Sequence, residues 1–175
     1  MLAGRVYALP YSKPVMRVML TLRPYAEADL PAMMALYRAT IHALCAKDYT
    51  PEQLAAWAPP QGDVARWQTK METEDCVVAE IDGAVVGFCS WTGDGYIDLL
   101  YVHHKWPRLG IASALHKRAE DALRQTGVLR LHTQASITAQ PFFLSQGYTV
   151  VKHQTVRIRG VNLSNAVMEK SLAGA

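Results

Sequence analysis

Apolar residues recur at two different spacings along this 175-residue chain, and the spacing predicts where strands and helices lie. Between Tyr96 and Val102 nearly every position is apolar, which is typical of an interior strand covered on both faces. From Gly110 to about Thr126 the apolar positions recur at helical spacing. The sequence therefore predicts a strand, a loop and a long helix, around which we expect the rest of the chain to be organised.

The rest of the chain carries clear start and turn signals. Thr50-Pro51-Glu52-Gln53 is a capping box that begins a short helix, and Asp82-Gly83 between apolar runs predicts a β-hairpin. Further strands are predicted over 18–23, 76–81, 85–92, 129–133, 148–158 and 163–171, and further helices over 30–44, 63–71 and around 142–144.

The connections between these elements predict the topology. Strands joined by tight turns are antiparallel, whereas the helix over 110–126 returns the chain so that the strand over 129–133 runs parallel to the one over 96–102. We therefore expect an α/β (α+β) fold with a mixed, mostly antiparallel sheet of six to seven strands and helices on both faces. Residues 18–175 form one domain in this interpretation, and residues 1–17 form a flexible arm. The true start could be Met1, Met16 or Met19.

Composition narrows the function classes. The net charge of +3 is mild and the basic residues are scattered, so no nucleic-acid partner is expected, and no segment is apolar enough to predict a membrane span. Cys45, Cys76 and Cys89 lie far apart without a C-x-x-C spacing, which favours a reducing, cytoplasmic compartment. We interpret them as buried small hydrophobes, with a cysteine nucleophile as the alternative. The six histidines show no metal-ligand spacing, so no metal is predicted.

The first turn of the helix at 110 is free of bulky side chains. Backbone N–H groups at a helix start lack intrahelical partners and carry the positive end of the helix dipole. Gly110 and Ala112 would let a phosphate approach these groups, Ser113 can donate a hydroxyl hydrogen bond, and Arg108 adds charge. The segment is either an anion site or an ordinary strand-loop-helix connection with Gly110 as punctuation.

Two segments resemble the GCN5-related N-acetyltransferase (GNAT) family. The segment HHKWPRLGIASAL is similar to the acyl-CoA loop of this family. The family pattern is Gln or Arg, then any two residues, Gly, any one residue, and Gly or Ala. In this sequence Pro107 stands at the Gln or Arg position. The segment AQPFFLSQGY, from Ala139 to Tyr148, resembles the family's Ala-x-x-Phe-Tyr-x-x-x-Gly-Phe segment, with Phe143 at the Tyr position. The resemblance covers nearly the whole chain and implies a splayed central parallel strand pair.

The resemblance also implies acetyl-CoA as co-substrate. It places the pyrophosphate at the loop before the long helix and the pantetheine arm along the strand ending at Val102, with Ser136 hydrogen-bonding the arm from the other side. The expected cofactor-binding residues are Leu100, Tyr101, Val102, Arg108, Leu109, Gly110, Ile111, Ala112, Ser113, Ser136, Phe142 and Phe143.

Asp98 is the candidate catalytic residue. It is the lone carboxylate in an apolar strand, shares a face with Leu100 and Val102 in strict alternation, and would act as a general base toward the amine; the alternative is a structural partner for a buried hydroxyl or Arg. Because the family's region between the first two strands covers the acceptor, Tyr49 and Trp57 are candidate acceptor contacts. Trp91 is a third candidate, whereas Trp67 is expected to close the core.

The predicted function is an acyl-CoA-dependent N-acyltransferase, an enzyme that moves acetyl from acetyl-CoA to a primary amine of a small, partly aromatic molecule by direct attack. A protein N-terminal or lysine acetyltransferase and a non-catalytic CoA-binding module are the alternatives. The protein is either a monomer or a homodimer in this interpretation.

Overall fold

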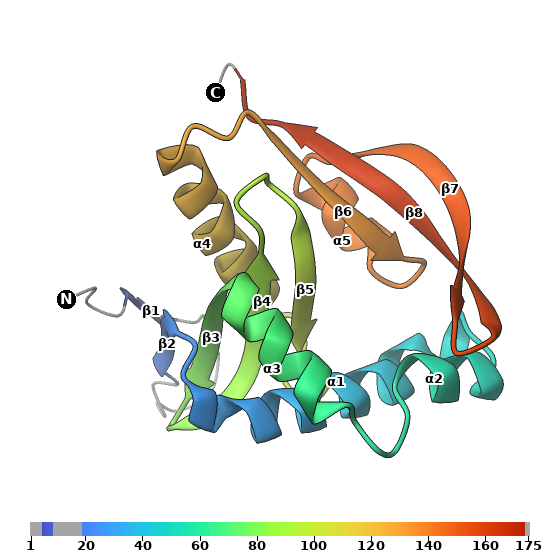
Figure 1. The fold of residues 1–175 in the computed structure, drawn as a ribbon. Coiled ribbons are helices and arrows are strands. Elements are labelled where there is room, and N and C mark those ends of the chain that lie inside the picture. The colour runs from blue at the N-terminus through green and yellow to red at the C-terminus, as the bar shows by residue number, and fades with distance from the viewer. Residues whose placement is uncertain (1–4, 9–18, 174–175) are drawn as a thin grey trace.

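The structure is a computed structural model that describes residues 5–8 and 19–173, and its strands form two sheets (Figure 1). The first is an antiparallel five-stranded sheet in the order β1 (Arg5–Ala8), β2 (Met19–Pro24), β3 (Asp75–Ile81), β4 (Ala84–Trp91) and β5 (Ile97–Val102). The second is a three-stranded sheet in the order β6 (Arg130–Ser136), β8 (Val161–Ser171) and β7 (Thr149–Ile158).

The N-terminal segment departs from the expected flexible arm. Arg5–Ala8 forms β1 and pairs with Met19–Leu22 of β2, so the expectation of a loose arm is wrong for these four residues. With β1, the described chain has eight strands where six to seven were expected. The remainder of the arm, the alternative starts Met1 and Met16, and Val18 of the first expected strand lie outside the described residues.

The two sheets meet at a single parallel bridge between Tyr96 and His132. There the His132 N–H donates to the Gly95 carbonyl at 2.9 Å. One step further the Thr133 hydroxyl donates to the Ile97 carbonyl at 2.8 Å, and beyond this point β5 and β6 are no longer paired. The expected splayed parallel pair is confirmed, and it leaves one side of β5 without a strand partner (Figure 1).

The glycine at this junction has no room for a side chain. Gly95 has a φ of +94°, and a Cβ there would lie 2.3 Å from the Arg130 carbonyl oxygen. We expect Gly95→Ala to destabilise the fold by about 1–3 kcal/mol, since the β4–β5 turn and β6 must separate. Gly93→Ala in the same turn is the control, because a Cβ at Gly93 has open space around it. Thermal unfolding that responds equally to both variants would contradict this reading of the junction.

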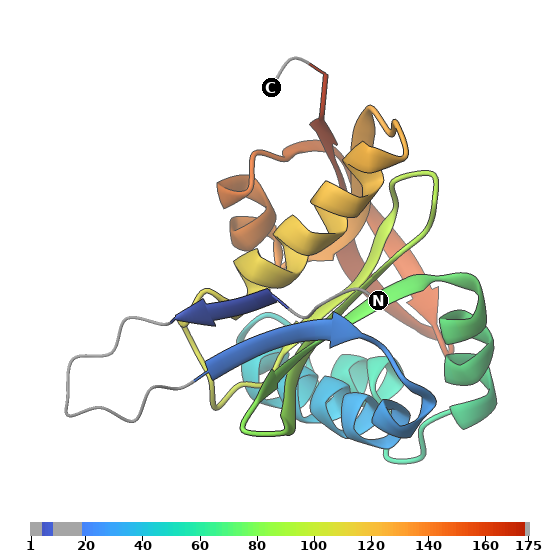
Figure 2. The same cartoon turned by 90° about the vertical axis from the view of Figure 1, so that its left-hand side faces the viewer.

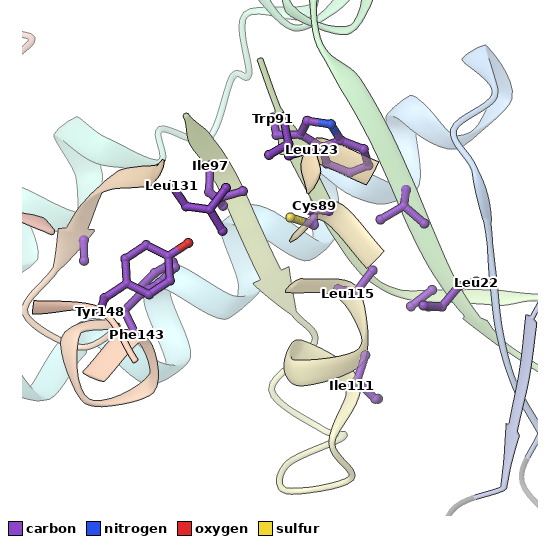
Figure 3. Packing of buried hydrophobic residues seen from close by; sticks show 14 of the residues in the cluster. Leu22, Cys89, Trp91, Ile97, Ile111, Leu115, Leu123, Leu131, Phe143 and Tyr148 are labelled. Carbon is purple, nitrogen blue, oxygen red and sulfur yellow. The ribbon is translucent and has the colours of Figure 1, made fainter. Parts of the chain in front are cut away.

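Helices cover both faces of the five-stranded sheet, as expected (Figure 2). On one face α1 (Leu30–Leu44) and α3 (Val64–Thr73) pack over Val78 and Phe88, and on the other α4 (Ile111–Gln125) packs through Ile111 and Leu115 (Figure 3). The short helices are η1 (Glu27–Asp29), η2 (Cys45–Lys47), α2 (Pro51–Trp57) and α5 (Gln140–Ser145). Among the helices of the described chain, none is long and apolar enough to cross a membrane.

The local signals in the sequence fold as predicted. Thr50 and Gln53 form the capping box of α2: the Gln53 N–H donates to the Thr50 hydroxyl oxygen at 3.3 Å, and the Thr50 N–H donates to the Gln53 side-chain carbonyl at 2.9 Å. The turn residues Asp82-Gly83 and Arg159-Gly160 all have positive φ, which is the backbone of a two-residue hairpin turn with the strand twist.

Candidate active site

Asp98 lies on a β-bulge. The register of β4 against β5 shifts so that Ser90 pairs with Leu99 and Trp91 pairs with Ile97, which leaves Asp98 without a partner on β4. A bulge breaks the alternation of side chains along a strand and re-aims the extra residue. The Asp98 carboxylate accordingly contacts Lys70 of α3, on the same side of the sheet as Leu99. The expectation that Asp98 shares a face with Leu100 and Val102 in strict alternation is wrong for this reason.

Asp98 belongs to a chain of hydrogen-bonded charges. The Lys70 ammonium donates to Asp98 and, at 2.9 Å, to Glu74, and the Ser90 hydroxyl donates to the second Glu74 oxygen at 2.6 Å. Burial disfavours the charge on Lys70, but the hydrogen bonds that its ammonium donates to Asp98 and Glu74 outweigh this effect and raise the pKa of Lys70. The Glu74 side chain is only 7% exposed, and burial raises its pKa. The network fixes the Asp98 carboxylate in one place.

Two cavities meet at Asp98. The wide cavity, of about 670 Å³, is lined by parts of α1, by Trp57 at the end of α2 and the segment that follows it to Asp63, by α3, by Asp98 and Leu99, and by residues 157–159 at the tip of the β7–β8 hairpin. The narrow cavity, of about 250 Å³, is lined by β5, the start of α4, β6, α5 and parts of α1 and η2. Among the described residues Asp98 and Trp57 are the two that line both. A molecule in one cavity therefore lies next to a molecule in the other at this carboxylate.

The narrow cavity brings together most of the expected cofactor-binding residues. Those that line it are Leu100, Tyr101, Val102, Ala112, Ser136, Phe142 and Phe143. They come from β5 and from the α4, β6 and α5 segments that follow it in the chain. The cavity occupies the space where β5 and β6 diverge, which is where an extended ligand arm would find backbone groups.

The backbone of β5 offers such groups. The His103 N–H donates to the Val86 carbonyl of β4 at 2.8 Å, and the polar groups of successive strand residues point in opposite directions. The N–H and C=O groups of Leu100 and Val102 therefore face away from β4. The Val102 carbonyl accepts a hydrogen bond from the Thr40 hydroxyl, 3.2 Å away, instead of pairing with a strand.

The start of α4 has the features of an anion site. Its N-cap is Gly110, at a φ of +73° and with no side chain to cap the helix, so the first amides of α4 have no capping partner in the described chain. A Cβ on Gly110 would meet nothing within 4 Å, so the space outside these amides is open. Arg108 is exposed and adopts a φ of +57°, while Ser113 is also exposed. This arrangement fits a diphosphate group approaching the helix axis.

The side chains of Leu109 and Ile111 pack into the protein and do not face the anion site. The Ile111 side chain is 1% exposed and packs in the core under β4, and Leu109 packs against the same cluster (Figure 3). Of these two, Ile111 is in the first turn of α4, where its backbone N–H is available while its side chain anchors the helix. Leu109 precedes the N-cap and contributes packing.

Of the three candidate acceptor contacts, one lines the cavities and two do not. Trp57 lines both cavities. Tyr49 lines neither cavity and is 6% exposed. Its hydroxyl donates to the Ser164 carbonyl at 2.7 Å and accepts from the Ile137 N–H at 2.9 Å, so it ties the segment after η2 to β8 and to the loop after β6. Trp91 is also 6% exposed and packs in the core beside Leu123 (Figure 3). The placement of Tyr49 and Trp91 corrects the expectation that they face an acceptor.

Several residues on the wide cavity were not singled out from the sequence. Lys70 and the arginines Arg38, Arg66, Arg157 and Arg159 come from segments that only the fold brings together. Trp67, expected to close the core, both packs edge-on against Tyr37, with ring centroids 5.2 Å apart, and lines this cavity. The spacing of Lys70 and its partner Glu74, which caps the C-terminal end of α3 four residues later, was the one available signal.

Phe143 occupies a wall of the narrow cavity without a hydroxyl group. The nearby Tyr148 is buried beside Phe143 (Figure 3). Its hydroxyl lies 2.9 Å from His116 Nε2, and Tyr148 lines neither cavity. Burial lowers the pKa of His116 to about 4 and raises that of Tyr148 above its usual value. Burial likewise raises the pKa of Tyr96 and Tyr101. All three phenols are therefore held in the protonated form near neutral pH.

The cysteines do not suit nucleophilic catalysis. Cys45 lines the narrow cavity, but burial raises the pKa of its thiol, and the reactive form of cysteine is the thiolate. Burial raises the pKa of Cys76 to about 12, and Cys89 is fully buried. Within the described residues no three His, Cys, Asp or Glu side chains are grouped to hold a metal ion.

Comparisons with known proteins agree with this geometry. A family model described as an acetyltransferase (GNAT) domain matches residues 45–172. The chain is 35% identical over 147 residues to the uncharacterized N-acetyltransferase YafP of Escherichia coli (strain K12), covering 84% of this chain and 93% of that protein. It matches the crystal structure of a GCN5-related N-acetyltransferase from Rhodopseudomonas palustris with a TM-score of 0.83 and 36% identity, over 86% of this chain and 94% of that one.

A third relative shares the fold at low identity. The PaiA N-acetyltransferase of Thermoplasma acidophilum, solved in complex with coenzyme A, matches with a TM-score of 0.72 and 17% identity, over 87% of this chain and 98% of that one. The family model covers well over half of the chain, and the two relatives above 30% identity cover more than four fifths of it. The chain therefore belongs to the GCN5-related N-acetyltransferase family.

Proposed function

We propose that this N-acetyltransferase moves an acetyl group from acetyl-CoA to the amine of a small, partly aromatic molecule held in the wide cavity. The observation that carries the proposal is the position of Asp98 at the junction of the two cavities. The volume of the wide cavity, about 670 Å³, falls in the range of small-molecule sites, and Tyr37, Trp57 and Trp67 supply aromatic walls.

The narrow cavity and the start of α4 are the proposed site of acetyl-CoA. The diphosphate would bind the first amides of α4 after Gly110, with Arg108 and Ser113 close by. The outward-facing backbone groups of Leu100 and Val102 would receive the amides of the pantetheine arm, with Ser136, Phe142 and Phe143 on the opposite wall. The coenzyme A bound by the Thermoplasma relative supports this assignment.

The proposed reaction is direct transfer. The nitrogen lone pair of the amine attacks the thioester carbonyl carbon, the carbon–sulfur bond breaks, and the thiolate of CoA leaves. Asp98 accepts the proton released by the amine, directly or through water, and a backbone N–H near Leu100 polarises the carbonyl. The buried, protonated thiols favour this route over a cysteine-bound acetyl intermediate.

No tyrosine is expected to act as general acid toward the thiolate. Phe143 stands at the position where the family motif has tyrosine, and its side chain has no proton to donate. A thiol with a pKa of about 8.5, taking cysteine as the model, is a tolerable leaving group near neutral pH. We expect Tyr→Phe at Tyr96, Tyr101 or Tyr148 to lower kcat by less than about tenfold, below the range of a true general acid. A far larger loss in one variant, at unchanged acetyl-CoA affinity, would assign the acid to that tyrosine.

A turnover screen tests the proposed function. Calorimetry first measures acetyl-CoA binding, and thiol release is then followed across small alkyl and aryl amines, aryl hydroxylamines and peptides with free N-termini or lysines. Turnover of small amines supports the proposal, preference for peptides would replace it with protein acetylation, and absence of acetyl-CoA binding would end it. A cytoplasmic location and a homodimer stay predictions from the sequence.

A further inference from the structure

The wide cavity is unusually rich in arginine. Arg38 comes from α1, Arg66 from α3, and Arg157 and Arg159 from the β7–β8 hairpin. Lys70 is a fifth basic residue there, and the wall contains two carboxylates, Asp63 and Asp98. The cavity therefore has a surplus of positive charge, although the basic residues look scattered along the sequence.

The two carboxylates do not neutralise the arginines. Asp98 pairs with Lys70, and Asp63 caps α3 by accepting a hydrogen bond from the Arg66 backbone N–H at 3.0 Å. In the part of the chain that the structure describes, no carboxylate lies within ion-pair distance of the Arg38, Arg66, Arg157 or Arg159 guanidinium. Elsewhere the arginines Arg23, Arg124 and Arg130 each pair with Asp or Glu.

Each arginine of the hairpin donates a hydrogen bond to a backbone carbonyl. Arg159 donates to the Ala56 carbonyl at the end of α2, 2.7 Å away, and Arg157 Nε donates to the Gly160 carbonyl at 3.3 Å. The charges of Arg66 and Arg159 both act on the Tyr37 hydroxyl: burial raises the pKa of Tyr37 to about 12, and these two arginines partly oppose the rise. Arginines from two distant segments thus converge on one point of the wall.

We propose that the acceptor is an amine that also carries an oxyanion, a carboxylate or a phosphorus oxyanion, which these arginines bind. The inference rests on the proposed function, because it takes the wide cavity as the acceptor site. The planar guanidinium matches both oxyanions with paired hydrogen bonds. The amine lies toward Asp98, the apolar body lies against Tyr37, Trp57 and Trp67, and the oxyanion lies toward the arginines.

An unpaired cluster of like charges repels itself, and an oxyanion relieves that repulsion. An amine without the oxyanion gains the apolar contacts alone. We therefore expect an acceptor that carries a carboxylate to have a kcat/KM at least about tenfold above that of the matching neutral amide. This is the scale of one or two charge-assisted hydrogen bonds. The difference should lie mainly in KM, because the arginines bind the acceptor and take no part in the acetyl transfer itself.

The test uses matched probe pairs: phenylalanine with phenylalaninamide, and 4-aminobenzoate with 4-aminobenzamide. The first pair offers an alkyl amine, and the second offers an aryl amine that is neutral near pH 7 in both members. A third arm, (4-aminophenyl)phosphonate, distinguishes a phosphorus oxyanion from a carboxylate. Turnover is measured with acetyl-CoA, and binding of each probe is measured separately by calorimetry with CoA present.

Arg38→Gln and Arg66→Gln are the informative variants, because no side-chain hydrogen bond holds either guanidinium in the described chain. Arg130→Gln is the control, since it removes an equal charge from an exposed position on β6 that pairs with Glu169. We expect the first two to reduce binding of the acids about tenfold and to leave the amides unchanged, and the control to alter neither. Rescue by Arg→Lys should be partial, because lysine lacks the paired geometry.

The binding measurement separates this inference from the proposed function. If acids bind more tightly than amides and the preference falls in Arg38→Gln and Arg66→Gln, the inference holds whichever amine is acetylated. If acid and amide bind or turn over equally, the inference is overturned while acetyl transfer to small amines stands. A preference that persists in both arginine variants overturns it as well.

Discussion

Asp98→Asn should lower kcat/KM by about 100-fold or more while leaving acetyl-CoA affinity unchanged. Asparagine has the shape of aspartate and can still accept a hydrogen bond from Lys70, but it cannot take the proton of the attacking amine. General bases contribute roughly 10²–10⁴-fold to enzymatic rates, which sets the expected size of the loss. Steady-state kinetics with an accepted amine, together with calorimetry of acetyl-CoA binding, measure both quantities.

Lys70→Gln is the matched comparison, because it removes the other half of the ion pair and leaves the Asp98 carboxylate in place. If Asp98 is the base, its asparagine variant loses far more activity than Lys70→Gln does. Equal losses in the two variants would indicate that the ion pair matters only for holding β5 against α3. A loss below about tenfold in Asp98→Asn would move the base to another group or to water.

Gly110→Val should weaken acetyl-CoA binding by about 10- to 100-fold. The substituted β-branched side chain would fill the open space outside the first amides of α4 and would strain a backbone held at a φ of +73°. Losing charged hydrogen bonds worth about 1.5–3 kcal/mol corresponds to this range of affinity. Calorimetry on the folded variant gives the affinity directly.

Gly127→Val separates the effect of backbone strain from the effect of blocking the phosphate position. Gly127 follows the other end of α4, has a φ of +81° and has equally open space around the position that a Cβ would occupy. The substitution imposes the same kind of backbone strain far from the proposed phosphate position. We expect it to lower thermal stability as Gly110→Val does but to leave acetyl-CoA affinity intact. Equal affinity in wild type and Gly110→Val would show that the phosphates bind elsewhere.

The fold was largely readable from the sequence because its signals are local. Periodicity, the Thr50 capping box and the hairpin turns depend on residues close together in the chain, and each predicted element appears within a few residues of its predicted bounds. The bulge could not be predicted from the sequence, because a strand with one extra residue has the same apolar pattern as a regular strand. Asp98 was therefore assigned to the wrong face of the sheet. The strand at Arg5–Ala8 was missed because an edge strand needs little apolar pattern of its own.

The candidate site was only half readable for a different reason. Much of the narrow cavity is built from the consecutive segments β5 to α5, which carry a recognisable motif, so Leu100, Ala112 and Phe142 could be found from sequence. The wide cavity takes its arginines from helices and a hairpin more than 90 residues apart, and no local pattern marks them as neighbours. Aromatic residues are ambiguous at sequence level, because burial and ligand contact favour the same side chains, as Tyr49 and Trp91 illustrate.

The division of the two cavities between different segments makes this chain a natural scaffold for redirecting acetylation. Apart from Asp98 and Trp57, no described residue lines both cavities, so residues 58–63 after α2 and residues 157–159 at the tip of the β7–β8 hairpin can be exchanged without touching the proposed donor side. Arg159 lies in the two-residue turn of this hairpin, and turns tolerate substitution better than the strands that they connect. Libraries confined to these two loops would vary acceptor choice while keeping one acetyl donor and one reaction centre.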